Sequence, residues 1–307
     1  MEPILTFLPK SITEVIMQLP SRQLSSLEEI RVRINRPLEI ADKGKYVLLP
    51  YVVTADDAIH LLNKISHFSI YTLEEELRRG YITIEGGHRV GLAGKVILEE
   101  GKVKAIRDVS SFNIRIAKEK IGIAEKLVPN IYRGDWLHTM IIGAPQTGKT
   151  TLLRDIARIV STGDEHHHFP AKKVGIVDER SEIAGSVGGI PQMTFGARVD
   201  VLDSCPKAEG MMMMIRSMSP EILVVDELGS KEDVEAVMEA VNAGIKLITT
   251  THGYSYADIK KRPILEPLLN LGIFERFVEL NRRAGPGSVQ AIRNADGKEV
   301  LQQVRVP

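Results

Sequence analysis

The sequence predicts an α/β protein: a domain with a mostly parallel β-sheet, preceded by a small α+β domain. Between residues 126 and 307, apolar strand-like runs alternate with helix-like runs, an order typical of a parallel, doubly wound sheet. The glycine-rich segment GAPQTGKT (143–150) follows the first apolar run and opens the first of these helices. In residues 1–125, short runs with strand periodicity are separated by turn signals, which predicts a separate small domain.

Composition narrows the class of protein. The chain has 307 residues, enough for two domains, and Lys+Arg and Asp+Glu both count 40. This balance argues against a strongly basic nucleic-acid binder. Cys205 is the one cysteine, so an intrachain disulfide is impossible. No run approaches the ~20 apolar residues of a membrane span, and the first residues lack the basic region of a signal peptide. We therefore expect a cytoplasmic protein that serves a membrane, if at all, by docking.

The expected elements of the first domain follow from periodicity and capping. Thr54 followed by Asp56 and Asp57 predicts a helix start, and Pro37 is expected to interrupt the second strand region. In order, we expect a helix within 1–20, strands within 27–42, a helix at 54–66, a strand meander at 80–106 and another strand at 110–119.

The expected elements of the second domain alternate in type. Strands are predicted at LHTMIIG (137–143), KKVGIVDER (172–180), EILVVDELG (221–229) and IKLITTTHG (245–253). Helices are predicted at 150–161, 210–220 and 231–244.

The segment 143–150 fits G-x-x-x-x-G-K-[ST], the phosphate-binding loop of nucleotide triphosphatases. An apolar strand before it and an amphipathic helix after it are the context that such a loop requires. We expect ATP to bind there, with Lys149 at the β- and γ-phosphates and the Thr150 hydroxyl as a ligand of Mg²⁺. The residues expected to bind the nucleotide are Gly143, Ala144, Pro145, Gln146, Thr147, Gly148, Lys149, Thr150 and Thr151.

Three further strand ends carry candidate groups, because the carboxyl ends of parallel strands face the ligand crevice. Asp226 is expected in the Mg²⁺ site and Glu227 is expected to polarise the attacking water. Glu179, in the acidic segment VDERSE, is a second candidate catalytic group, and the alternative is a solvated acidic loop. In TTTHG, Thr250 or Thr251 could contact the water or the γ-phosphate, and His252 could sense the phosphate.

The run of three histidines at 166–168 is read as a solvated loop. Three adjacent histidines cannot all face one metal ion from an ordered turn.

These motifs occur in the chain order of the secretion-superfamily ATPases, the hexameric motors of type II and type IV secretion and of pilus assembly. The segments EEIRVRINRPLEI, GHRVGLAGK and VGIVDERSEIAGS more closely resemble the stage III sporulation AA family of endospore-forming bacteria. That resemblance implies a mother-cell ATPase of the channel that links mother cell and forespore. It also implies a homo-oligomer, typically a hexamer, located in the cytoplasm at a membrane complex and partnered by the channel proteins of that complex.

The segment KAIRDVSSFNIRI resembles the part of these motors that presents arginines to a neighbouring subunit's nucleotide. The resemblance makes Arg107 and Arg115 candidate catalytic residues acting in trans, and Arg89 a weaker candidate. The alternative is that they are ordinary exposed strand arginines.

Two other functions stay open at this point. One is an AAA-type ATPase acting with single-stranded nucleic acid, which the charge balance and the 5% aromatic content disfavour. The other is a nucleotide-binding scaffold without useful turnover, which the presence of Glu227 disfavours.

Overall fold

The computed structural model describes residues 2–65, 80–164, 169–283 and 285–300, and divides the chain into two compact units, Met1–Lys118 and Glu119–Pro307. The sequence-based boundary lay after residue 125. Residues 119–125 are fastened to the second unit instead. The buried carboxylate of Asp155 accepts the backbone N–H groups of Gly122 at 3.2 Å and Ala124 at 2.8 Å. The three histidines at 166–168 lie outside the described residues.

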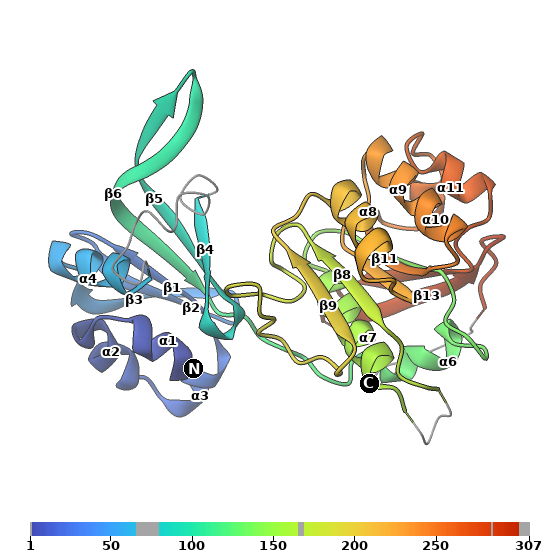
Figure 1. Cartoon of the computed structure of the whole chain (residues 1–307). Coiled ribbons are helices and arrows are strands. Elements are labelled where there is room, and N and C mark those ends of the chain that lie inside the picture. Colours follow the sequence, from blue (N-terminus) through green and yellow to red (C-terminus); the bar gives the residue numbers. More distant parts are fainter. Residues whose placement is uncertain (1, 66–79, 165–168, 284, 301–307) are drawn as a thin grey trace. The chain divides into compact units, whose positions relative to one another are not determined.

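The first unit is an antiparallel sheet in the order β3-β2-β1-β6-β5-β4, with one face packed against helices (Figure 1). Pro9 separates the first two helices, and Pro37 begins a new strand. The main elements are α1 (Glu2–Phe7), α2 (Lys10–Met17), α3 (Ser21–Ser26), β1 (Leu27–Arg33), β2 (Pro37–Asp42), β3 (Lys45–Val52), α4 (Ala55–Ile65), β4 (Tyr81–Ile84), β5 (His88–Glu99) and β6 (Lys102–Arg115).

The expected strand at 110–119 is not separate. It is the second half of β6, which runs without a break from Lys102 to Arg115. The distal parts of β5 and β6 extend as a two-stranded ribbon beyond the other strands (Figure 1). The pairing shifts at Ala93/Lys95, and a Cβ on Gly94 would lie 2.5 Å from the carbonyl oxygen of Arg107. Only glycine therefore fits where the ribbon leaves the sheet.

The second unit holds the predicted parallel sheet, in the order β13-β12-β7-β11-β10-β8-β9, with only β13 antiparallel to its neighbour. Its strands are β7 (Thr139–Gly143), β8 (Val174–Asp178), β9 (Val199–Asp203), β10 (Ile222–Val225), β11 (Lys246–His252), β12 (Arg276–Asn281) and β13 (Ser288–Asn294). Its helices are α6 (Val128–Ile131), α7 (Lys149–Thr162), α8 (Lys207–Ser217), α9 (Lys231–Asn242), α10 (Tyr256–Ile259) and α11 (Glu266–Asn270).

Helices cover both faces of this sheet. On β7, Ile141 packs with α6 and α7, whereas Met140 and Ile142 pack with α8, α9 and α11 on the other face. Strands buried on both faces read as continuous apolar runs, and this is why the sequence identified β7, β8, β10 and β11. The predicted fold class, an α/β core after an α+β domain, is confirmed.

Candidate functional site

The segment 143–150 forms a loop between the end of β7 and the first turn of α7. Gly148 has φ 89° and precedes the first helical residue, Lys149. Gln146 has φ 62°, a left-handed backbone conformation that residues other than glycine and asparagine rarely adopt. The Thr147 hydroxyl donates to the Ala144 carbonyl at 2.8 Å, which ties the loop to itself. Free N–H groups at a helix start, preceded by such a loop, form an anion site.

Lys149 lies buried under this loop. Its ammonium donates to the carbonyl of Ala144 at 3.3 Å and lies 3.2 Å from Nδ1 of His252. Burial lowers the pKa of Lys149, and the carboxylates of Glu227 and Asp226 oppose that shift. The lysine is thus a desolvated cation in a carboxylate-rich site, which interacts more strongly with a phosphate than an exposed lysine would.

Thr150, in the first turn of α7, meets Asp226, the residue that follows β10. The hydroxyl of Thr150 donates to Oδ2 of Asp226 at 2.6 Å, although the residues are 76 positions apart. The hydroxyl of Thr250 donates to the other carboxylate oxygen, Oδ1. Thr151, next along α7, is half-buried. A hydroxyl beside a carboxylate offers the oxygen ligands that Mg²⁺ prefers, so these residues fit that ion.

Glu227 is held in a left-handed backbone conformation with φ 55°. Its N–H donates to the Thr250 hydroxyl at 2.9 Å, which stabilises this turn. The carboxylate lies 2.9 Å from Nε2 of His252 and 3.5 Å from Nη1 of Arg180. Strained backbone of this kind clusters at functional sites, because it aims a side chain that a relaxed turn would direct elsewhere.

His252 joins Lys149 to Glu227. Its Nδ1 faces the ammonium of Lys149, which can only donate, so Nδ1 accepts. Its Nε2 then carries the proton and donates to Glu227. One arrangement of the ring proton satisfies both contacts, which links Lys149 to the carboxylate that follows β10.

The acidic segment after β8 is organised by Asp178. This buried carboxylate accepts the N–H groups of Glu182 at 2.8 Å, Ile183 at 2.9 Å and Ala184 at 2.8 Å. Burial raises the pKa of Asp178 to about 6, against these hydrogen bonds. From α7, Arg154 donates to the carbonyls of Ile183 and Glu182, each at 2.6 Å. The loop is thereby fastened to the helix that starts at the phosphate loop.

Glu179 pairs with Lys207 at the start of α8, at 2.5 Å. The sequence analysis missed Lys207 and Arg154, since neither belongs to a motif. A small pocket lies where β8 and β10 end. Its lining residues are Asp178, Glu179, Arg180, Glu182, Lys207, Asp226 and Glu227.

Thr250 and Thr251 lie at the end of β11, as the sequence predicted, and both are fully buried. Thr250 bonds to Asp226 and Glu227, and Thr251 donates to the carbonyl of Leu228 at 3.2 Å. These hydroxyls therefore fix the turn that follows β10, and their contact with a water or a phosphate stays a prediction.

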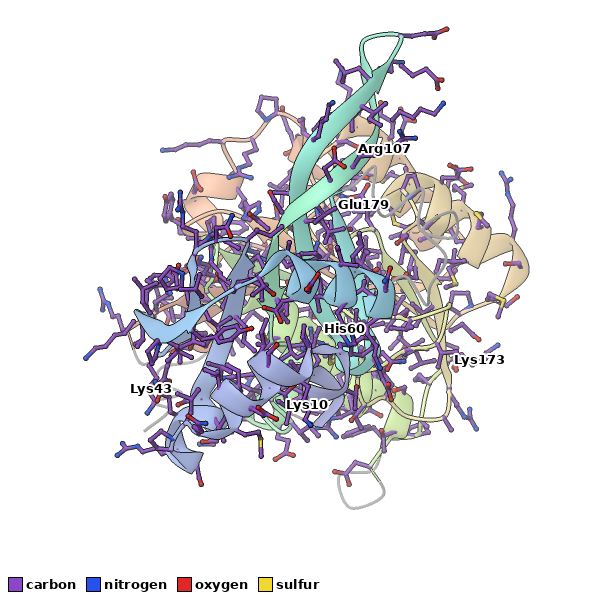
Figure 2. The ribbon with its side chains drawn as sticks, turned by 90° about the vertical axis from the view of Figure 1, so that its left-hand side faces the viewer. Lys10, Lys43, His60, Arg107, Lys173 and Glu179 are labelled. Atoms are coloured by element: carbon purple, nitrogen blue, oxygen red, sulfur yellow. The ribbon has the colours of Figure 1, made fainter. Side chains whose placement is uncertain are left out.

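The three candidate arginines belong to the first unit. Arg107 is exposed on the β5–β6 ribbon (Figure 2). Arg115 is exposed at the end of β6, where it pairs in register with Arg89 on one side and Glu29 on the other. The guanidinium of Arg89 lies 4.1 Å from the ring centre of Tyr81. Arg89 therefore has an aromatic partner within its own sheet.

Within the part of the chain that the structure describes, no helix is long and apolar enough to cross a membrane. Over the same residues, no group of three or more His, Cys, Asp and Glu side chains could hold a metal ion by itself.

Solved structures with a similar fold include the ATPase DotB of Legionella pneumophila and the pilus retraction motor PilT with bound ADP. DotB has a TM-score of 0.54 and 16% identity, with 82% of this chain and 71% of that chain covered. PilT has a TM-score of 0.59 and 15% identity, with 87% and 76% covered. These likenesses show the fold.

Relatives by sequence show more. The protein named Stage III sporulation protein AA of Bacillus subtilis (strain 168) is 56% identical over 297 residues, which are 97% of this chain and 96% of the relative. The uncharacterized protein ycf45 of Porphyra purpurea is 24% identical. The match covers 100% of this chain and 48% of the length of that relative. The family model described as sporulation stage III, protein AA, matches residues 1–300. The chain belongs to that sporulation family, as its motifs suggested.

Proposed function

We propose that this protein is an ATP-hydrolysing ring motor that energises assembly of, or transport through, the channel between mother cell and forespore during sporulation. The observation that carries the proposal is the line Lys149–His252–Glu227 beside the Thr150–Asp226 pair. These contacts bring a phosphate-binding lysine, a Mg²⁺-binding hydroxyl and a carboxylate for a water to one edge of the sheet. With MgATP bound and an arginine supplied by a neighbouring subunit, these groups would form a phosphoryl-transfer site.

The proposal gives each residue of the candidate site a role. Backbone N–H groups of the loop, which Pro145 lacks, bind the phosphates, and Lys149 neutralises charge at the β- and γ-positions. Thr150 and Asp226 would hold Mg²⁺, which would supply charge neutralisation on the same phosphates. Glu227 orients and deprotonates a water. His252 connects the carboxylate of Glu227 to the ammonium of Lys149. Glu179 is the reserve candidate for the acid–base role, although its pairing with Lys207 favours Glu227.

The choice of partners rests on the family. The family and its Bacillus relative are named for stage III of sporulation. The solved structures that share the fold are an ATPase and a pilus retraction motor. We propose a homo-oligomer, most simply a hexamer, that docks from the mother-cell cytoplasm on membrane channel proteins.

The proposal is tested by measuring ATP hydrolysis by the purified chain with and without single-stranded DNA. We expect Mg²⁺-dependent turnover that Lys149→Ala abolishes and that DNA leaves unchanged. Stimulation by DNA would favour the nucleic-acid-linked ATPase, and nucleotide binding without turnover would favour the scaffold. A pull-down from sporulating cells is expected to recover membrane channel proteins with the wild-type chain.

A further inference from the structure

The turn between β12 and β13 is attached to the phosphate loop. The N–H of Gly287 donates to the carbonyl of Thr147 at 2.7 Å. A Cβ on Gly148 would lie 2.6 Å from the nitrogen of Gly287, so the two backbones touch. Both glycines are left-handed, with φ 89° and 92°. The C-terminal hairpin is therefore a wall of the nucleotide site, which no sequence motif indicated.

This wall places a guanidinium at the loop. Nη1 of Arg282 donates to the side-chain oxygen of Gln146 at 3.3 Å, and both residues are exposed. Gln146 is the loop residue with the left-handed φ of 62°. Among the described residues no carboxylate forms an ion pair with Arg282, and the carboxamide carries no charge to balance it. Arg282 thus brings an uncompensated positive charge to the rim of the loop.

We propose that Arg282 contacts the phosphates of a bound nucleoside di- or triphosphate, as a second cation from the same chain beside Lys149. The inference rests on the proposed function, since it concerns the same nucleotide. Lys149 reaches the phosphates from beneath the loop as a single point charge. A guanidinium presents a planar fork of donors that matches phosphate oxygens. Gln146 holds that fork in place before the nucleotide arrives, which lowers the cost of ordering the side chain on binding.

The size of the effect follows from exposure. A hydrogen bond to a charged group is stronger than one between neutral groups, but water and salt screen it at an exposed site. The expected loss on removing Arg282 is therefore roughly tenfold in affinity.

The chain offers matched variants. Arg282→Gln removes the charge and keeps an amide that can donate to Gln146. Arg283→Ala removes the same charge one residue away; Arg283 is also exposed, and its backbone N–H bonds to the side chain of Asn281 at 2.9 Å. Lys149→Ala serves as the reference for loss of the phosphate site.

The experiment is a titration of each variant with MgADP by calorimetry, at low and at high ionic strength. At low ionic strength we expect Arg282→Gln to bind roughly ten times more weakly than wild type, and Arg283→Ala within about twofold of it. The deficit of Arg282→Gln should shrink at high ionic strength, and Arg282→Lys should recover part of the affinity.

Failure of the two ideas can be told apart. Wild-type protein that does not bind MgADP would overturn the proposed function. Wild-type protein that binds, with Lys149→Ala abolishing binding and Arg282→Gln matching Arg283→Ala, would leave the proposed function standing and overturn this inference. A deficit that salt does not reduce would also overturn it, because a purely structural loss is not screened.

Discussion

At the scale of single residues, the proposed roles divide nucleotide binding and hydrolysis between Lys149 and Glu227. Lys149 is buried beneath the loop, whereas Glu227 lies at the end of β10 and reaches Lys149 only through His252. Replacing Lys149 therefore leaves Glu227 in place, and the reverse also holds. The two variants should differ in whether they lose nucleotide binding or only hydrolysis.

Lys149→Ala is expected to abolish nucleotide binding, because it removes the charge that faces the β- and γ-phosphates. Glu227→Gln is expected to bind ATP with nearly wild-type affinity and to lose hydrolysis, because Thr150 and Asp226 remain while the water loses its base. Binding of fluorescent ATP and release of phosphate, measured on the same preparations, check both. Equal loss of binding in the two variants would show that these roles are wrongly assigned.

Motif residues could be predicted from the sequence because the backbone of a phosphate loop is set by its own glycines and lysine. Asp178 and Arg154 could not be assigned in this way. Asp178 was grouped with its acidic neighbours, yet it accepts three backbone N–H groups of the following turn. Arg154 is an ordinary helix residue in the sequence, and its role depends on a loop 28 residues away.

At the scale of elements, the sequence identified the strands that are apolar on both faces and missed β9, β12 and β13. All five residues of β9 are half-buried, so no apolar run marks it. β12 is buried but contains Arg276 and Glu279. Glu279 is paired with Arg293 of β13 at 2.8 Å, a tertiary contact that hides its charge. Strands whose charges are compensated by distant partners do not show the pattern of a buried strand.

His88, at the start of β5, makes the first unit sensitive to pH. Its Nδ1 accepts the N–H of Ala117 at 2.9 Å, and burial lowers the pKa of His88 to about 4. The unfolded value is about 6.5, so acid protonates the unfolded chain first. The stability that His88 provides is present above that value and is lost as pH falls toward 4.

Between about pH 7 and about pH 5 the free energy of unfolding of the first unit should fall by about 2 kcal/mol from this group. Hydrogen exchange of β5 and β6 peptides, corrected for intrinsic rates, measures it. The drop should be absent in His88→Gln and unchanged in His60→Gln, a control at an exposed position of α4. An equal drop in His88→Gln would assign the pH dependence to other groups.

At the scale of the whole molecule, the sequence predicted two domains, and the structure has two compact units. The boundary differs because residues 119–125 look like a linker by composition but are anchored on Asp155 of α7. The same helix begins at the phosphate loop. The link between the units is thus anchored on the helix that follows the phosphate loop.

We propose that hydrolysis requires a ring, in which Arg107 or Arg115 of one chain completes the nucleotide site of the next chain. An arginine that acts in this way contributes on the order of 10³ in turnover. Both side chains are exposed, as such a role requires.

The most direct measurement is turnover after mixing Arg107→Ala or Arg115→Ala chains with Lys149→Ala chains. We predict that at least one arginine variant is inactive alone with ATP affinity nearly kept, that Lys149→Ala is inactive alone, and that the mixture hydrolyses ATP. In mixed rings an intact loop meets an intact neighbouring arginine. Full activity of both arginine variants, or no recovery on mixing while rings still form, would contradict the account.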